Sequence, residues 1–254
     1  MISHATSRLA YPLRIRGLAT TTTAVSPTGA SGETCVVAAA RHYLKEKKRL
    51  VDSLSPADYA AVDAEVGASV GGHMRHTLDH FSKCLAAAAT APSSSSAALQ
   101  QDTTGDGDGS SSNLADPTRR PRSPAGSAAA IRYDHRVRGG SVETCPSAAS
   151  RSISSLLQQI QELPRGRELR KTHIGATFTV ALEGAREEHE FESNLERELF
   201  FCCHHGIHHD AMIQLILRGM GEKGEIALRQ AGSGLGVAPS TLEHLQRNTP
   251  EEGR

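Results

Sequence analysis

A long helical segment near the C-terminus constrains the fold most strongly. Residues 192–218 carry apolar side chains at helical spacing, and the segment ends before Gly219 and Gly221. It contains the run "FFCCHHGIHHDAMIQLIL", in which four histidines interrupt an otherwise apolar sequence. An amphipathic helix of this length buries its apolar stripe against other helices. The segment therefore predicts a core helix that carries histidines.

The helical wheel separates these four histidines into two pairs. His205 lies at the centre of the apolar stripe and His209 lies about 40° away, still inside it, whereas His204 and His208 fall on the flank. Two imidazoles at i and i+4 on one face can share a metal ion. The alternative is a pair of hydrogen-bonded core histidines, because buried rings must find polar partners. Glu198 falls on the same face, where it either orients a ligand or pairs with an arginine.

Three further histidines lie on a helix expected over about residues 67–88. The stretch "GGHMRHTLDHF" contains His73, His76 and His80 within a narrow arc. The apolar face of this helix has His73 nearest its edge and His76 furthest away, so the wheel alone nominates His73 or His80. Three histidines from two helices would leave a coordination position open, as catalytic zinc sites do.

The other ordered segments complete a helical fold. Helices are expected over residues 34–54 and 145–163, with Thr34 and Thr144 as N-caps. The stretch "THIGATFTVALEG" alternates and is rich in β-branched residues, so it predicts a short strand or hairpin arm before the last helix. Four long helices with one short β excursion predict an all-α fold, a four-helix bundle.

Two segments are excluded from that fold. Residues 1–32 contain Arg8, Arg14 and Arg16 and no acid, which is typical of a transit peptide, with the mitochondrion favoured over the plastid. The alternative is a disordered tail on a cytoplasmic protein. Residues 89–128 hold almost no large apolar side chain and predict a disordered insert. The sequence therefore predicts one domain over residues 33–246 with this insert, followed by a tail at 247–254.

Overall composition narrows the classes of partner. The formal net charge is 0, which does not favour a nucleic-acid or membrane-surface binder. No apolar run approaches the roughly 18 residues that a membrane span needs. The 5 cysteines form no CxxC pair, so they are expected to be reduced, in a reducing compartment.

Four motifs occur in order along the chain: "SVGGHMRHTLDHF", "YDHRVRGGSVET", "RELFFCCHHGIHHDAMIQL" and "GLGVAPSTLEHL". Together they resemble the DinB-like (YfiT-like) superfamily of metal-dependent proteins, in particular an uncharacterised branch with a "GxHxRHxxxxF" helix. The resemblance covers residues 34–246 except the insert. It implies an up-down-down-up four-helix bundle.

The same resemblance implies a metal site. In this family a divalent ion is bound by one histidine from the second helix and by two at i and i+4 from the fourth. Carried over by motif, these ligands are His76, His205 and His209, with His73 in reserve because the helical wheel disfavours His76. Three imidazoles suit zinc, nickel, iron or manganese, so the identity of the metal stays open.

The resemblance also bears on function. Relatives include thiol-dependent isomerases and S-transferases, which implies a metal-dependent hydrolase or thiol S-transferase. The alternative is a non-catalytic bundle whose histidines are structural or bind a metal for stability only. The expected partners are a small-molecule or thiol substrate and a second copy of the chain in a homodimer. Neither nucleic acid nor a membrane is expected.

A basic loop lies between the two histidine-bearing segments. The stretch "IRYDHRVRGGSVET" groups Arg132, Arg136 and Arg138, which beside a metal could clamp an anionic substrate. The alternative, which the sequence favours slightly, is a solvated loop whose arginines pair with Asp134 or Glu143.

Overall fold

The structure, a computed structural model, describes residues 34–91, 130–232 and 234–248. The predicted leader, residues 1–32, lies outside this part of the chain. Of the predicted insert only residues 89–91 are described, and helix α3 continues through Thr90. Of the predicted tail only residues 247 and 248 are described, and they end helix α9.

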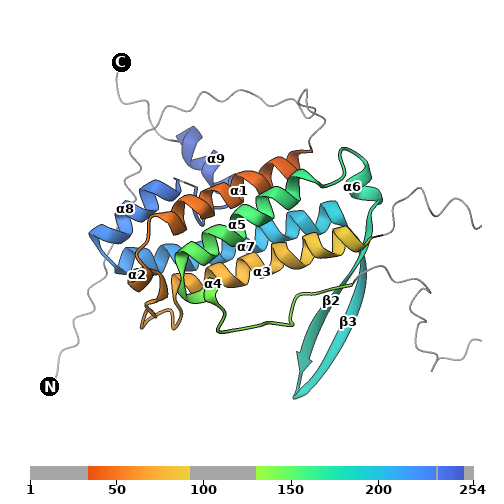
Figure 1. Cartoon of the computed structure of the whole chain (residues 1–254), viewed down its shortest axis with the longest axis horizontal. Helices are drawn as coiled ribbons and strands as arrows, with labels where there is room; N and C mark the ends of the chain where they lie inside the picture. The colour runs from red at the N-terminus through yellow and green to blue at the C-terminus, as the bar shows by residue number, and fades with distance from the viewer. Residues whose placement is uncertain (1–33, 92–129, 233, 249–254) are drawn as a thin grey trace, which may run out of the picture.

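Four long helices lie alongside one another, and a β-hairpin projects away from them (Figure 1). The long helices are α1 (Cys35–Asp52), α3 (Val70–Thr90), α5 (Pro146–Gln161) and α7 (Leu195–Gly219). They match the four predicted helical segments. The shorter helices are α2 (Pro56–Ala60), α4 (Ser141–Thr144), α6 (Glu168–Lys171), α8 (Glu222–Ala231) and α9 (Pro239–Asn248).

The strands make the predicted fold class wrong. Strands β1 (Ala130–Arg132), β2 (His173–Leu182) and β3 (Ala185–Asn194) form a three-stranded mixed sheet in the order β1-β2-β3. β1 pairs in parallel with β2, and β2 pairs antiparallel with β3. With this sheet and five additional helices in the described part of the chain, the protein is not a simple all-α four-helix bundle in the up-down-down-up arrangement.

The second hairpin strand escaped the sequence analysis for a physical reason. β3 reads "AREEHEFESN", and its first eight residues are exposed, so no apolar alternation reveals it. What fixes the hairpin is its two-residue turn, in which Glu183 and Gly184 both have positive φ, of 47° and 88°. Such turns match the right-handed twist of paired strands. β1 has only three residues and is a strand only through its pairing with β2.

Local caps explain where the histidine-bearing helices begin. The side chain of Ser69 accepts a hydrogen bond from the backbone N–H of Gly72 and caps α3. The side chain of Asn194 accepts one from the N–H of Arg197 and caps α7. The predicted N-cap Thr144 instead ends α4. Cys145 is the N-cap of α5, which begins at Pro146 because proline favours the first helical turn.

Helix α7 occupies a central position among the long helices. It packs against α3 on one side and against α1 on another, and α8 folds back onto it. At Gly206 it approaches α1 so closely that an added Cβ would lie 2.3 Å from the Tyr43 hydroxyl oxygen. This approach explains a glycine in the middle of a long helix. Within the described residues, no helix is long and apolar enough to cross a membrane.

Candidate metal centre

Helix α3 contributes three histidines to the interface with α7. His76 and His80 are buried, with 6% and 4% of their surface exposed, and His73 is half-buried. Their positions follow from helical geometry, because residues three or four apart lie on one face. The expectation that His76 lies furthest from the apolar face is therefore wrong. The wheel misplaced it because the buried face of α3 is widened by contacts with α5 and α7 at once.

Helix α7 contributes His205 and His209, as the helical wheel predicts. Both are half-buried and face α3, whereas His204 and His208 are exposed. The Nε2 atom of His205 lies 3.2 Å from Nε2 of His76 and 3.1 Å from Nε2 of His209. His205 therefore meets each of the other two predicted ligands, but the three histidines whose ring nitrogens all lie within 4.8 Å of one another are His76, His80 and His205, without His209.

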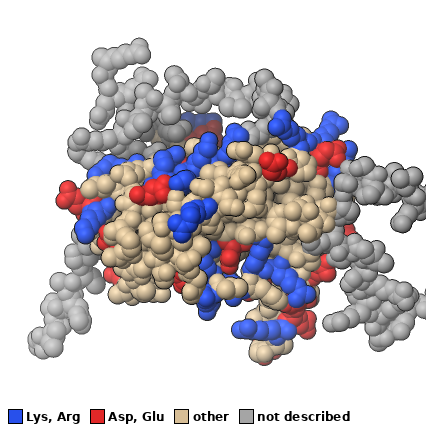
Figure 2. All heavy atoms as spheres, in the orientation of Figure 1, with Lys and Arg blue, Asp and Glu red and all other residues tan. Residues whose placement is uncertain are grey.

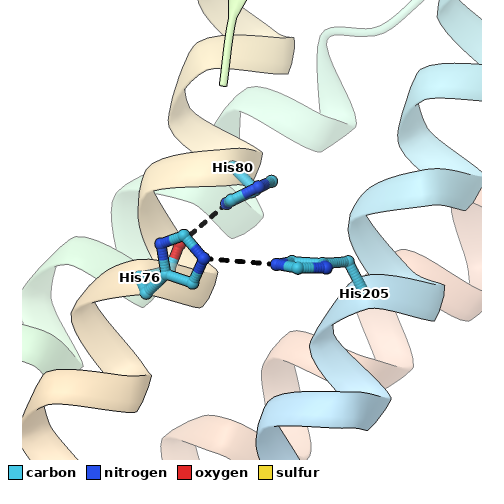
Figure 3. Close-up of side chains that lie close together, drawn as sticks. All are labelled: His76, His80 and His205. Atoms are coloured by element: carbon cyan, nitrogen blue, oxygen red, sulfur yellow. Dashed lines mark hydrogen bonds between the residues drawn. The ribbon is translucent and has the colours of Figure 1, made fainter. Parts of the chain in front are cut away.

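His80 belongs to the same cluster. Ring nitrogens of His76, His80 and His205 all lie within 4.8 Å of one another, and the three rings meet between α3 and α7 (Figure 3). The Nδ1 atom of His80 lies 3.0 Å from the carbonyl oxygen of His76, to which an Nδ1–H donates. In that tautomer Nε2 keeps its lone pair and is ready to bind a metal.

His73, the reserve ligand, contacts the cluster at its edge. Its Nδ1 lies 2.9 Å from Nδ1 of His209. If the Nδ1–H of His209 donates here, Nε2 of His209 is left with its lone pair directed at His205. A ligand histidine is commonly oriented through its second ring nitrogen in this way. His73 is thus placed to position His209.

Burial keeps this cluster uncharged. The pKa of His76 is lowered to about 2, that of His209 to about 3 and that of His80 to about 4; burial is the largest cause, and the neighbouring imidazoles contribute to each shift. Burial also lowers the pKa of His205 and His73. Neutral imidazole is the form that ligates metals.

The donor set fits a shared ion. Two nitrogen ligands of one tetrahedral zinc ion lie about 3.3 Å apart, given Zn–N bonds of about 2.0–2.1 Å. The separations of 3.2 and 3.1 Å around His205 are close to this value. The Nδ1 atom of His76 is buried without a hydrogen-bond partner. This atom is not the nitrogen that faces His205, so a metal bound through Nε2 would leave it without a partner. His76 and His205 are common to both possible triads, and His209 or His80 would complete the set.

Aromatic rings form one wall of the cluster. The Tyr133 ring stacks on His80 with centroids 4.8 Å apart, and Phe201 stacks on His205 at 5.6 Å. The Tyr133 hydroxyl donates to Oε2 of Glu198 at 2.8 Å. Glu198 also pairs with Arg197 at 2.5 Å. Of the two roles predicted for Glu198, the structure supports the arginine pair, and the carboxylate reaches the cluster only through Tyr133.

His80 is the residue that the sequence analysis left out of the proposed triad. The signal was available, because His76 and His80 have the same i, i+4 spacing as His205 and His209. The helical wheel nominated His80, but the family motif, which points to one ligand on this helix, displaced it. Spacing alone does not reveal how many of the five rings one ion would use.

Comparison with known proteins adds little to this geometry. No protein-family model matches the chain. No solved structure matches it significantly. The chain is similar to "FK506-binding protein 5" of Rhizopus delemar, with 30% identity over 117 residues. The match covers 46% of this chain and only 28% of that protein, which does not show a shared family. The resemblance to the DinB-like superfamily stays a prediction.

Proposed function

We propose that the protein binds one divalent metal ion between α3 and α7, and that the ion serves a metal-dependent hydrolase or thiol transferase of the DinB-like type. One observation carries the proposal: neutral ring nitrogens from two helices converge at 3.1–3.2 Å with no carboxylate among them. A buried set of bases without a counter-charge is suited to accept a cation.

Individual residues have separable roles in this proposal. His76 and His205 hold the ion, with His209 as the third ligand and His80 as the competing one. His73 orients His209 through the Nδ1–Nδ1 contact. Tyr133 and Phe201 shield the rings from water on one side. A metal bound by three histidines leaves a position at which it can activate a water or a thiol.

Two alanine variants within the run "HHGIHH" test whether the protein binds a metal ion. Wild type, His205→Ala and His204→Ala are reconstituted separately with zinc, nickel, iron and manganese, dialysed and assayed by elemental analysis. One equivalent is expected in wild type and in His204→Ala, because His204 is exposed, and none in His205→Ala. Wild-type protein without stoichiometric metal under any of these conditions would end the proposal.

A second measurement separates the enzyme from its alternative, a metal that serves stability only. The visible spectrum of the cobalt-substituted protein reports how many ligands surround the ion. A catalytic site exchanges a ligand when a small thiol such as 2-mercaptoethanol is added, and the spectrum shifts. A spectrum that does not respond to added thiol or azide indicates a closed, structural site.

A further inference from the structure

A hollow of about 790 Å³ lies between the 133–140 loop and the hairpin strands β2 and β3. Three arginines line it: Arg136 and Arg138 from the loop, and Arg186 from the start of β3. All three are exposed. Basic and acidic side chains lie beside one another on and next to the projecting hairpin (Figure 2). The loop and the hairpin, far apart in sequence, together make this surface.

The acidic groups of the hollow are already engaged. Asp134 accepts a hydrogen bond from the backbone N–H of Thr179 at 2.6 Å. Glu188 lies 3.7 Å from Arg132 and 3.1 Å from His135. Arg136, Arg138 and Arg186, in contrast, make no ion pair or hydrogen bond within the described residues. The predicted pairing of the loop arginines with Asp134 or Glu143 is therefore absent for Arg136 and Arg138.

The loop that presents these arginines is anchored at both ends. Before Arg136, the Lys83 ammonium of α3 donates to the carbonyl oxygens of Tyr133 and His135. After Arg138, the backbone N–H of Gly139 donates to Glu143 at 3.0 Å. Glu143 in turn lies 3.4 Å from Arg75 of α3. A loop held at both ends loses little further freedom when it binds a ligand.

The same loop connects the hollow to the histidine cluster. Tyr133 stacks on His80, and Arg136 follows three residues later. The loop that brings Arg136 and Arg138 to the hollow thus also borders the histidine cluster, through Tyr133.

We infer that the hollow binds an oxyanion group, a phosphate or a carboxylate, of the substrate on which the metal centre acts. Guanidinium groups bind both kinds of oxyanion through paired N–H donors. Three arginines line the hollow without a side-chain partner among the described residues, whereas Asp134 already accepts a hydrogen bond and Glu188 already lies beside Arg132 and His135, and this difference gives the surface its preference for anions. The inference rests on the proposed metal-dependent function, to which it adds the substrate class: a small anionic molecule.

The test measures anion binding by isothermal titration calorimetry with inorganic phosphate and, separately, with succinate. The full chain is used with and without bound nickel. The Arg136→Ala/Arg138→Ala variant is expected to lose at least tenfold in affinity for the preferred anion and to keep its metal stoichiometry. Arg136→Lys is expected to lose less, because it keeps the charge but not the planar fork. Arg229→Ala, an exposed arginine of α8, is the matched control and should bind like wild type.

The outcomes distinguish this inference from the proposed function. Saturable binding to neither anion, or binding that the double variant leaves unchanged, overturns the inference. Binding that requires nickel and survives in the double variant also overturns it, because the anion would then sit on the metal alone. Arginine-dependent binding supports it, and the preferred anion identifies the substrate group. Absence of metal from wild type would overturn the proposed function separately, since that result comes from elemental analysis.

Discussion

Two buried polar clusters lie on different faces of α7, and they differ in how their charges are satisfied. Toward α1, Asp210 forms an ion pair with Lys47 at 2.6 Å and accepts a hydrogen bond from Tyr43 at 3.2 Å. Toward α3, His205 and His209 meet the histidines of that helix with no acid among them. One cluster contains its own counter-charge, and the other contains only neutral bases.

The contrast teaches what each cluster is for. Lys47 and Asp210 have 0% and 2% of their surface exposed. Burial alone lowers the pKa of Lys47 and raises that of Asp210, and the attraction between the two opposes both shifts. The two opposite charges of this cluster are paired with each other within the chain. In the histidine cluster, Nε2 of His205 lies 3.2 Å from Nε2 of His76 and 3.1 Å from Nε2 of His209, an arrangement of bases that is suited to accept a cation.

The largest expected effect is a loss of stability when the ion pair between Lys47 and Asp210 is broken. Asp210→Ala leaves the Lys47 ammonium buried without its counter-charge, and the free energy of unfolding should fall by about 3–5 kcal/mol. Urea unfolding followed by circular dichroism measures it. The Lys47→Met/Asp210→Leu variant is the control and should lose much less, since no lone charge stays buried. Equal losses in both variants would mean that packing, rather than charge, dominates there.

A bound metal ion should stabilise the protein through the histidine cluster between α3 and α7. At a free metal concentration of 100 times the dissociation constant, the free energy of unfolding should rise by about 2.7 kcal/mol, and a chelator should reverse the gain. The Lys47→Met/Asp210→Leu variant should show the same gain, because its substitutions leave the α3 face unchanged. If that variant gains nothing from metal, the two clusters are not independent and the comparison fails.

Which histidine completes the triad should appear as a difference in metal affinity. His209→Ala should weaken metal binding at least about 100-fold, because it removes a ligand. His80→Ala and His73→Ala should weaken it by at most about 10–100-fold, the range typical of losing a group that only orients a ligand. Competition with a chromophoric chelator gives the dissociation constants. The opposite order for His80 and His209 would make His80 the third ligand.

The smallest effect is expected at the exposed histidines of α7. His208→Ala should change the free energy of unfolding by less than about 0.5 kcal/mol, because its side chain is exposed and touches the cluster only through ring contacts with His205 and His209. Its metal stoichiometry should equal that of wild type. Thermal unfolding in the metal-loaded state checks both expectations, and a loss of metal here would show that the cluster extends around the helix.

Much of the site prediction came from helical periodicity. It separated His205 and His209 from His204 and His208, and the structure confirms that division. It failed for His76, because a helix that packs on two neighbours buries a wider arc than one apolar stripe indicates. It offered no sign of Lys47, since a charged residue is expected to be exposed unless a partner meets it.

The sequence by itself determined the four long helices and the inward direction of His205 and His209, because both depend on the spacing of residues within one segment. Only the tertiary structure decided which rings meet, that His80 joins them, and that an acidic strand pairs into a mixed sheet. It also decided that Arg136 and Arg138 face a hollow without partners. These outcomes depend on contacts between residues distant in sequence, such as His76 with His205, which only the packing of the whole chain brings together.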